Sequence, residues 1–140
     1  MRIAIGSDHG GFAMKGEIIS LLVEQGHEVR DLGTDSEQSV HYPDFARAVC
    51  GAVAAGEAER GILVCGTGIG MSMAANRNPA IRAALCHDGF TARMSREHND
   101  ANVLCLGERV LGIGVALDIV DLWMRTEFAG GRHLTRINMF

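Results

Sequence analysis

The sequence has few aromatic residues, no long hydrophobic run and no run of basic residues. Aromatic side chains make up 5% of its 140 residues although 47% are hydrophobic, so the core must consist of Val, Ile, Leu, Ala and Met. The net charge of −4, without a basic run to neutralise phosphates, argues against a nucleic-acid partner. No stretch approaches the roughly 18 apolar residues of a membrane span, and the N-terminal apolar stretch is too short for a signal peptide. We expect one globular domain, residues 1–140, and no membrane partner.

The four cysteines form no C-x-x-C pair, which is the spacing typical of many metal and redox sites. They are Cys50, Cys65, Cys86 and Cys105, and three of them lie in apolar, strand-like runs. Reduced thiols in a cytoplasmic protein are the interpretation that this usage favours. No histidine and carboxylate are spaced on one helix face as metal ligands would be, so no metal is expected.

Strand-like and helix-like patterns alternate along the whole chain. The expected strands are 2–7, 27–33, 60–66, 81–87 and 102–107, and the expected helices are 11–26, 42–56, a helix opening at the glycine loop and running through Met73 and Ala75, 88–98 and 114–128. Five such units predict an α/β fold with a parallel sheet covered on both faces. Ligands gather beyond the carboxyl ends of strands in such folds. The segments expected there are Ser7–His9, Cys65–Gly70, His87–Asp88 and Gly107–Arg109.

The segment GILVCGTGIGMSMAAN, residues 61–76, carries the most specific local pattern. A dinucleotide loop would have a glycine where this chain has Met71, and the G-K-[ST] ending of a nucleoside-triphosphate loop is missing. Three alternating glycines, Gly66, Gly68 and Gly70, with Thr67 between them, favour an anion-binding loop over a simple tight turn. The spacing does not distinguish a phosphate from an oxyanion formed during a reaction.

Cys65 stands directly before this loop. A cysteine in an apolar strand is commonly a buried core thiol, but one that faces a helix N-terminus has a stabilised thiolate. That setting favours a base or a nucleophile. The other three cysteines have no such setting and are assigned to the core.

Several other polar residues are candidates on local context. His9 follows Asp8 at the end of the first strand, where a polar pair beside glycines favours function. His98 lies in the polar stretch REHNDAN, where a solvated histidine at a helix end fits as well. Arg132 and Arg136 would share one face of a helix and grip a phosphate, although a solvated basic tail has the same spacing.

Four stretches together resemble ribose-5-phosphate isomerase type B, in the family that also contains allose- and galactose-6-phosphate isomerases. They are SDHGGFAMK, CGTGIGMSMAAN, REHNDANVLCLGERV and GGRHLTR, which run from the first strand to the tail. The resemblance implies a three-layer α/β/α Rossmann-like sandwich with a five-stranded parallel sheet. It also implies a homodimer, in some members a dimer of dimers, with active sites shared between subunits, and no metal or cofactor.

Carried over by position, the resemblance makes Cys65 the general base of an aldose–ketose isomerase that acts through a cis-enediolate. The amides of the loop stabilise the enediolate oxygen, with Thr67 nearby, and His98 opens the furanose ring. The implied substrate-binding residues are Asp8, His9, Tyr42, Gly66, Gly68, Ile69, Gly70, Asn99, Arg109, Arg132 and Arg136.

Within that set, His9, Arg109, Arg132 and Arg136 would bind the phosphate, while Asp8 and Tyr42 would hold the sugar. The resemblance implies that His98, Asn99 and Arg109 reach the site from the partner chain. One branch of the family has serine in place of Cys65 and a glutamate base in place of Met71, so this chain resembles the cysteine branch. His41 stands where aspartate is common in the family, which leaves the choice of sugar open.

The leading hypothesis is the interconversion of ribose 5-phosphate and ribulose 5-phosphate. One alternative is the same chemistry on allose or galactose 6-phosphate or on a tetrose 4-phosphate. A different class is a small nucleotide-binding module whose glycine loop holds phosphate without catalysis. Such a module needs neither Cys65 nor His98.

Overall fold

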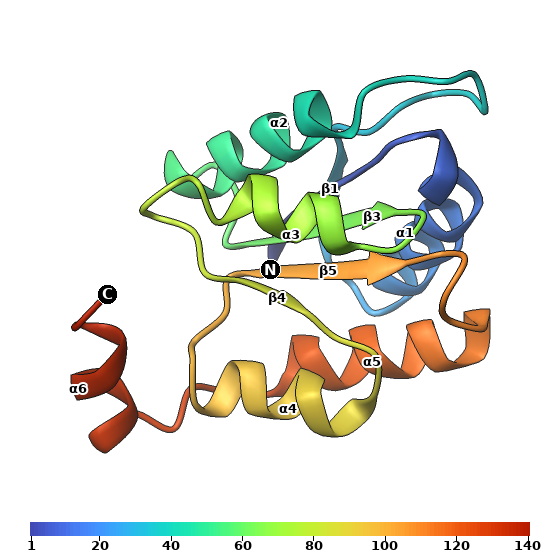
Figure 1. Cartoon of the computed structure of the whole chain (residues 1–140). Coiled ribbons are helices and arrows are strands. Elements are labelled where there is room, and N and C mark those ends of the chain that lie inside the picture. The colour runs from blue at the N-terminus through green and yellow to red at the C-terminus, as the bar shows by residue number, and fades with distance from the viewer.

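The computed structural model describes residues 1–140 as a five-stranded, all-parallel sheet in the order β2-β1-β3-β5-β4 (Figure 1). The strands are β1 (Arg2–Ser7), β2 (Glu28–Asp31), β3 (Arg60–Cys65), β4 (Ala83–Leu85) and β5 (Val103–Gly107). The helices are α1 (Phe12–Glu24), α2 (Tyr42–Ala54), α3 (Ile69–Ala75), α4 (Gly89–Glu97), α5 (Ile113–Arg125) and α6 (Arg132–Ile137), with a 3₁₀ turn, η1 (His9–Gly11). None of the helices combines the length and the apolar character that a bilayer crossing requires.

The strands are buried on both faces, and their alternating side chains feed two separate cores. Ile62 and Val64 point to the face covered by α1, α4 and α5, whereas Leu63 and Cys65 point to the face covered by α2 and α3 (Figure 1). Because successive strand residues face opposite sides, a continuous apolar run fits only a doubly covered sheet. The predicted three-layer sandwich with a five-stranded parallel sheet is confirmed.

The boundaries differ most at β4, where the apolar run 81–87 predicted a longer strand. Only Ala83–Leu85 pairs with β5, which is the one neighbour of the edge strand β4 in the sheet. The side-chain amide of Asn76 bonds both the N–H of Ala83, at 2.9 Å, and its carbonyl, at 3.0 Å. This contact blunts an edge that would otherwise be open to another strand.

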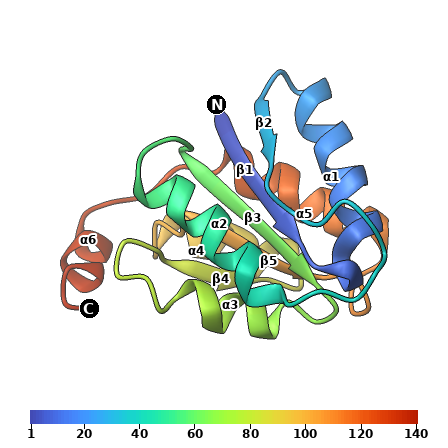
Figure 2. The same ribbon diagram turned by 90° about the horizontal axis from the view of Figure 1, so that it is seen from above.

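The order in which strands are added to the sheet reverses between β1 and β3. The connection after β1 leads to β2 on one side, and the connection after β2 returns to β3 on the other side (Figure 2). Open α/β sheets bind ligands at such a switch point, beyond the carboxyl ends of the two strands. β5 pairs with β3, so the loops after β1, β3 and β5 meet there.

Candidate active site

Cys65 is the last residue of β3, and its side chain is almost fully buried. Its Sγ atom accepts a hydrogen bond from the backbone N–H of Gly68 at 3.1 Å. This N–H points at the sulfur from the loop that leads into α3. The geometry therefore suits a cysteine that exchanges protons.

The other three cysteines lie in environments that favour the protonated thiol. Burial raises the pKa of Cys50 to about 11, and burial also raises the pKa values of Cys86 and Cys105. None of the four cysteines forms a disulfide. These environments agree with the assignment of Cys50, Cys86 and Cys105 to the core.

The glycine loop runs from Cys65 into α3 with its amides partly unused. Gly68 has φ +77°, and a Cβ there would lie 2.5 Å from Leu85 Cδ1 and 2.9 Å from the carbonyl carbon of Leu106, so only glycine fits. Within the chain, the N–H groups of Gly66, Thr67 and Gly70 donate to no acceptor. Ile69 donates its N–H to Thr67 Oγ1 at 3.2 Å. The loop thus offers backbone donors beside the sulfur, as an oxyanion requires.

The turn after β1 packs directly on this loop. The N–H of Asp8 donates to the carbonyl of Val64 at 3.3 Å, and a Cβ on Gly10 would lie 3.2 Å from the nitrogen of Gly66. Asp8 Oδ1 accepts from the N–H of Gly10 at 2.9 Å. His9 Nδ1 accepts from the N–H of Val40 at 3.2 Å, so a neutral ring carries its proton on Nε2, which is free to donate to a ligand.

Tyr42 and Arg109 flank the two ends of the loop. A Cβ on Gly70 would lie 2.6 Å from Tyr42 Cζ, and a Cβ on Gly66 would lie 3.1 Å from Arg109 Nη1. The structure therefore brings one group of sequence-predicted residues together in a single chain. This first group comprises Asp8, His9, Tyr42, Cys65, Gly66, Thr67, Gly68, Ile69, Gly70 and Arg109.

A second group lies at the amino ends of the strands. His98 caps α4, its ring stacks on that of His133 in α6 at 4.1 Å between centroids, and Arg132 and Arg136 belong to the same helix. The carbonyl of Asn102, three residues beyond Asn99, accepts from Gly61 at the start of β3, whereas Cys65 ends β3. Figures 1 and 2 both show α6 standing apart from the sandwich on the side where the strands begin. A strand of this length spans roughly 16 Å, so the two groups do not meet within one chain.

Arg109 differs from the expectation that it reaches the site from a partner chain. Its side chain already lies against Gly66 of its own chain, and its N–H donates to the carbonyl of Gly66 at 3.0 Å. The second group of predicted residues therefore consists of His98, Asn99, Arg132 and Arg136.

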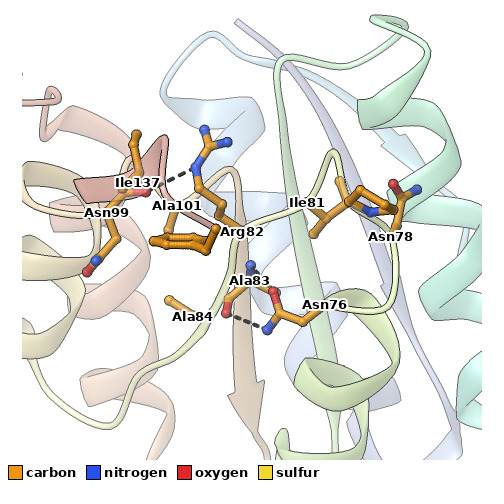
Figure 3. Close-up of a pocket in the computed structure, with 11 residues that line it drawn as sticks. Asn76, Asn78, Ile81, Arg82, Ala83, Ala84, Asn99, Ala101 and Ile137 are labelled. Atoms are coloured by element: carbon orange, nitrogen blue, oxygen red, sulfur yellow. Dashed lines mark hydrogen bonds between the residues drawn. The ribbon is translucent and has the colours of Figure 1, made fainter. Parts of the chain in front are cut away.

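A pocket of about 540 Å³ lies away from Cys65. It lies between β4 and the C-terminal segment and includes Asn99 from the second group (Figure 3). Its polar groups are largely used within the chain, because Arg82 bonds the carbonyls of Asn99 and Asp100 and Asn76 bonds Ala83. No cluster of three or more His, Cys, Asp or Glu side chains is arranged as a metal site.

Sequence reasoning missed three contacts at or beside the predicted residues. They are the bond from the Val40 amide to His9, the stacking of the His133 ring on His98, and the bond from the N–H of Met14 to the carboxylate of Glu108. His133 had a visible signal, since it stands between Arg132 and Arg136. The other two contacts join residues 31 and 94 positions apart and leave no local pattern.

Comparison with known proteins decides the family. The ribose/galactose isomerase family model matches residues 3–140. The chain belongs to this family. The ribose-5-phosphate isomerase B of Escherichia coli is 50% identical over 136 residues, which cover 97% of this chain and 91% of that protein. The solved structure of ribose-5-phosphate isomerase B from Clostridium thermocellum superposes with a TM-score of 0.98 at 58% identity, covering 99% of this chain and 94% of that one.

Relatives within the ribose/galactose isomerase family differ in the sugar that their names give. The D-erythrulose-4-phosphate isomerase of Pectobacterium atrosepticum is 42% identical over 132 residues, which cover 94% of this chain and 87% of that protein. Family membership shows the reaction class: the chain is a sugar-phosphate isomerase that exchanges aldose and ketose.

Proposed function

We propose that the protein interconverts ribose 5-phosphate and ribulose 5-phosphate with Cys65 as the base. The observation that carries the proposal is the 3.1 Å bond from the Gly68 amide to Cys65 Sγ, beside three further amides that donate to nothing in the chain. Identity of 50% to the Escherichia coli enzyme supports the five-carbon substrate.

In this mechanism the thiolate of Cys65 removes the proton from C2 of the open-chain aldose. The electron pair moves onto the carbonyl oxygen at C1, and the amides of Gly66, Thr67 and Gly70 stabilise the resulting enediolate. The thiol then returns the proton to C1 while the hydroxyl proton of O2 moves to O1, which gives the ketose. Losing one oxyanion donor in comparable sites costs about 3–4 kcal/mol of transition-state stabilisation.

The phosphate would be bound by His9, through Nε2–H, and by Arg109 from the same chain. Asp8 and Tyr42 then face the sugar hydroxyls. Arg132 and Arg136 would complete the phosphate site from the second group, with His98 opening the furanose ring and Asn99 beside it. This assignment needs residues from both ends of the strands.

A second copy of the chain would supply the missing group. In a twofold dimer, the first group of one subunit faces the second group of its partner, and the reverse pair forms a second site. We therefore infer a homodimer, or a dimer of dimers, with shared active sites. The separation of the two groups within one chain supports this arrangement. The four unpaired cysteines support a reducing compartment, the cytoplasm.

Tetrose 4-phosphates are one alternative class of substrate, which the name of the Pectobacterium relative supports. Six-carbon 6-phosphates are the other alternative. The test is a panel of four-, five- and six-carbon aldose phosphates, assayed for ketose formation in the presence of EDTA. The highest kcat/KM is expected for ribose 5-phosphate. A higher kcat/KM for a tetrose or hexose phosphate would reassign the substrate, and activity only after a divalent ion is restored would contradict the mechanism.

A further inference from the structure

Glu108 lies in the loop after β5 and bonds the end of β3 and the first turn of α1, which flank the other two loops at the switch point. Its backbone N–H donates to the carbonyl of Cys65 at 3.0 Å, and its carboxylate accepts from the N–H of Met14, in the first turn of α1. Arg109, the next residue, bonds the carbonyl of Gly66. One residue at the end of β5 is thus tied to both the β3 loop and the helix that follows the β1 turn.

Helix α1 needs a cap from elsewhere in the chain. Its own N-cap is Gly11, which offers no side chain, and its first turn contains no acidic residue. A side chain cannot be placed there, because a Cβ on Gly11 would lie 2.7 Å from the backbone carbonyl of Val64. The first N–H groups of a helix lack partners inside the helix and favour a negative charge. The carboxylate of Glu108 meets this need from 94 positions along the chain.

The turn that leads directly into the capped end of α1 carries two candidate substrate-binding residues. Asp8 and His9 stand immediately before Gly10 and Gly11, so the position of the first turn of α1 fixes the frame on which both side chains are held. The backbone N–H of Asp8 bonds Val64, the neighbour of Cys65, and the backbone N–H of Arg109 bonds Gly66 in the same loop. A shift of the α1 turn would therefore move Asp8 and His9 relative to the base and the phosphate site.

We propose that Glu108 is a positioning residue that holds the turn bearing Asp8 and His9 in register with the β3 and β5 loops. This proposal rests on the proposed function for its kinetic consequence. Asp8 and His9 bind parts of the substrate away from the transferred proton, so misplacing them weakens ground state and transition state alike. Loss of such binding raises KM while leaving kcat nearly unchanged.

The test compares E108A, which removes the acceptor, with E108Q, which keeps an amide oxygen in its place. The matched control is E17A, because Glu17 lines the same shallow pocket beside α1 but makes no hydrogen bond there. With ribose 5-phosphate, E108A is expected to raise KM about tenfold, E108Q to restore most of the loss, and E17A to match the wild type. An unchanged KM in E108A, measured well below its melting temperature, would overturn the proposal.

Amide hydrogen exchange supplies a readout that is independent of the reaction. The amides of Met14 and Gly10 should exchange faster in E108A than in the wild type and E17A. If the wild type turns over none of the sugar phosphates and these amides still exchange faster in E108A, the positioning role stands and the proposed function is rejected. Unchanged exchange at both amides would reject the positioning role.

Discussion

At the scale of the residue, the proposed chemistry depends on the hydrogen bond that the backbone donates to the sulfur atom of Cys65. Cys65 and Cys105 line the same core, yet burial raises the pKa of Cys105 whereas Cys65 accepts a hydrogen bond from an amide. Strand position decides the difference. Cys65 is the final residue of β3, where the chain turns and its N–H groups become available, and Cys105 lies in the middle of β5.

Replacing Cys65 tests its role as the base. Cys65→Ala is expected to lower kcat by about 10²–10⁴-fold, since the base acts in the transition state, with sugar-phosphate affinity within a small factor of the wild type. Cys65→Ser should be nearly as damaging because a hydroxyl is a far weaker base at neutral pH. Steady-state kinetics and calorimetric binding measure both quantities. The control is Cys50→Ala, in the same core, which should retain kcat; near-normal kcat in Cys65→Ser would place the base elsewhere.

His27 gives the fold a pH dependence near neutrality. Burial, together with the positive charges of the N-terminus and Arg60, lowers the pKa of His27 from its ordinary value of 6.5. The unfolded chain therefore binds more protons than the folded one, and stability falls as the pH drops below about 6.5. His27→Gln removes this titration, so the free energy of unfolding should vary less with pH than in the wild type. Urea unfolding between about pH 5.5 and 7.5 measures it, and equal slopes would contradict the assignment.

At the scale of the element, one buried ammonium group anchors the connection that leads from β2 to Tyr42. Lys15 is 3% exposed, and its Nζ donates to both carboxylate oxygens of Asp31, at 2.9 and 2.8 Å, and to the carbonyl of Thr34 at 2.6 Å. The N–H of Val40 bonds His9 at the far end of the same connection. The segment is thus held at both ends by the elements that carry the candidate site.

Asp31→Ala leaves the buried ammonium of Lys15 without its carboxylate. We expect a loss of about 2–3 kcal/mol in the free energy of unfolding, at the low end for a broken buried pair because Asp31 itself is 43% exposed. Denaturant unfolding measures it. Asp44→Ala breaks an ion pair with Arg47 that is exposed on both sides, and should cost less than about 0.5 kcal/mol. Equal losses in the two variants would mean that Lys15 is not held by Asp31.

The types and order of the strands and of the longer helices could be predicted from the sequence, because the spacing of apolar residues and the glycines that end an element are local signals. The continuous apolar run in residues 60–66 and the glycine at position 26 are examples. The extent of β4 could not be predicted from the apolar run 81–87, and neither could the bonds from Asn76 to Ala83 on its outer side. Nor could the cap on α1, which joins Met14 to Glu108 across 94 positions.

At the scale of the whole molecule, the candidate residues separate into two groups at opposite ends of the parallel strands. Each motif indicates its own chemistry, but no local pattern gives the distance from His98 to Cys65. That distance follows from the direction of the strands: α4 runs back against them, so His98 lies where β5 begins and Cys65 lies where β3 ends. The proposed function therefore implies a site that two chains build together.

Mixing two inactive variants tests this central claim most directly. Cys65→Ala destroys the first group and His98→Asn destroys the second, so each homodimer lacks both complete sites. After subunit exchange, a heterodimer contains one site that pairs an intact Cys65 with an intact His98 and one that has neither. Activity on ribose 5-phosphate should return, to about half the wild-type level per heterodimer if the sites act independently. No return of activity, with heterodimers confirmed by mass, would contradict the shared site and place every catalytic residue within one chain.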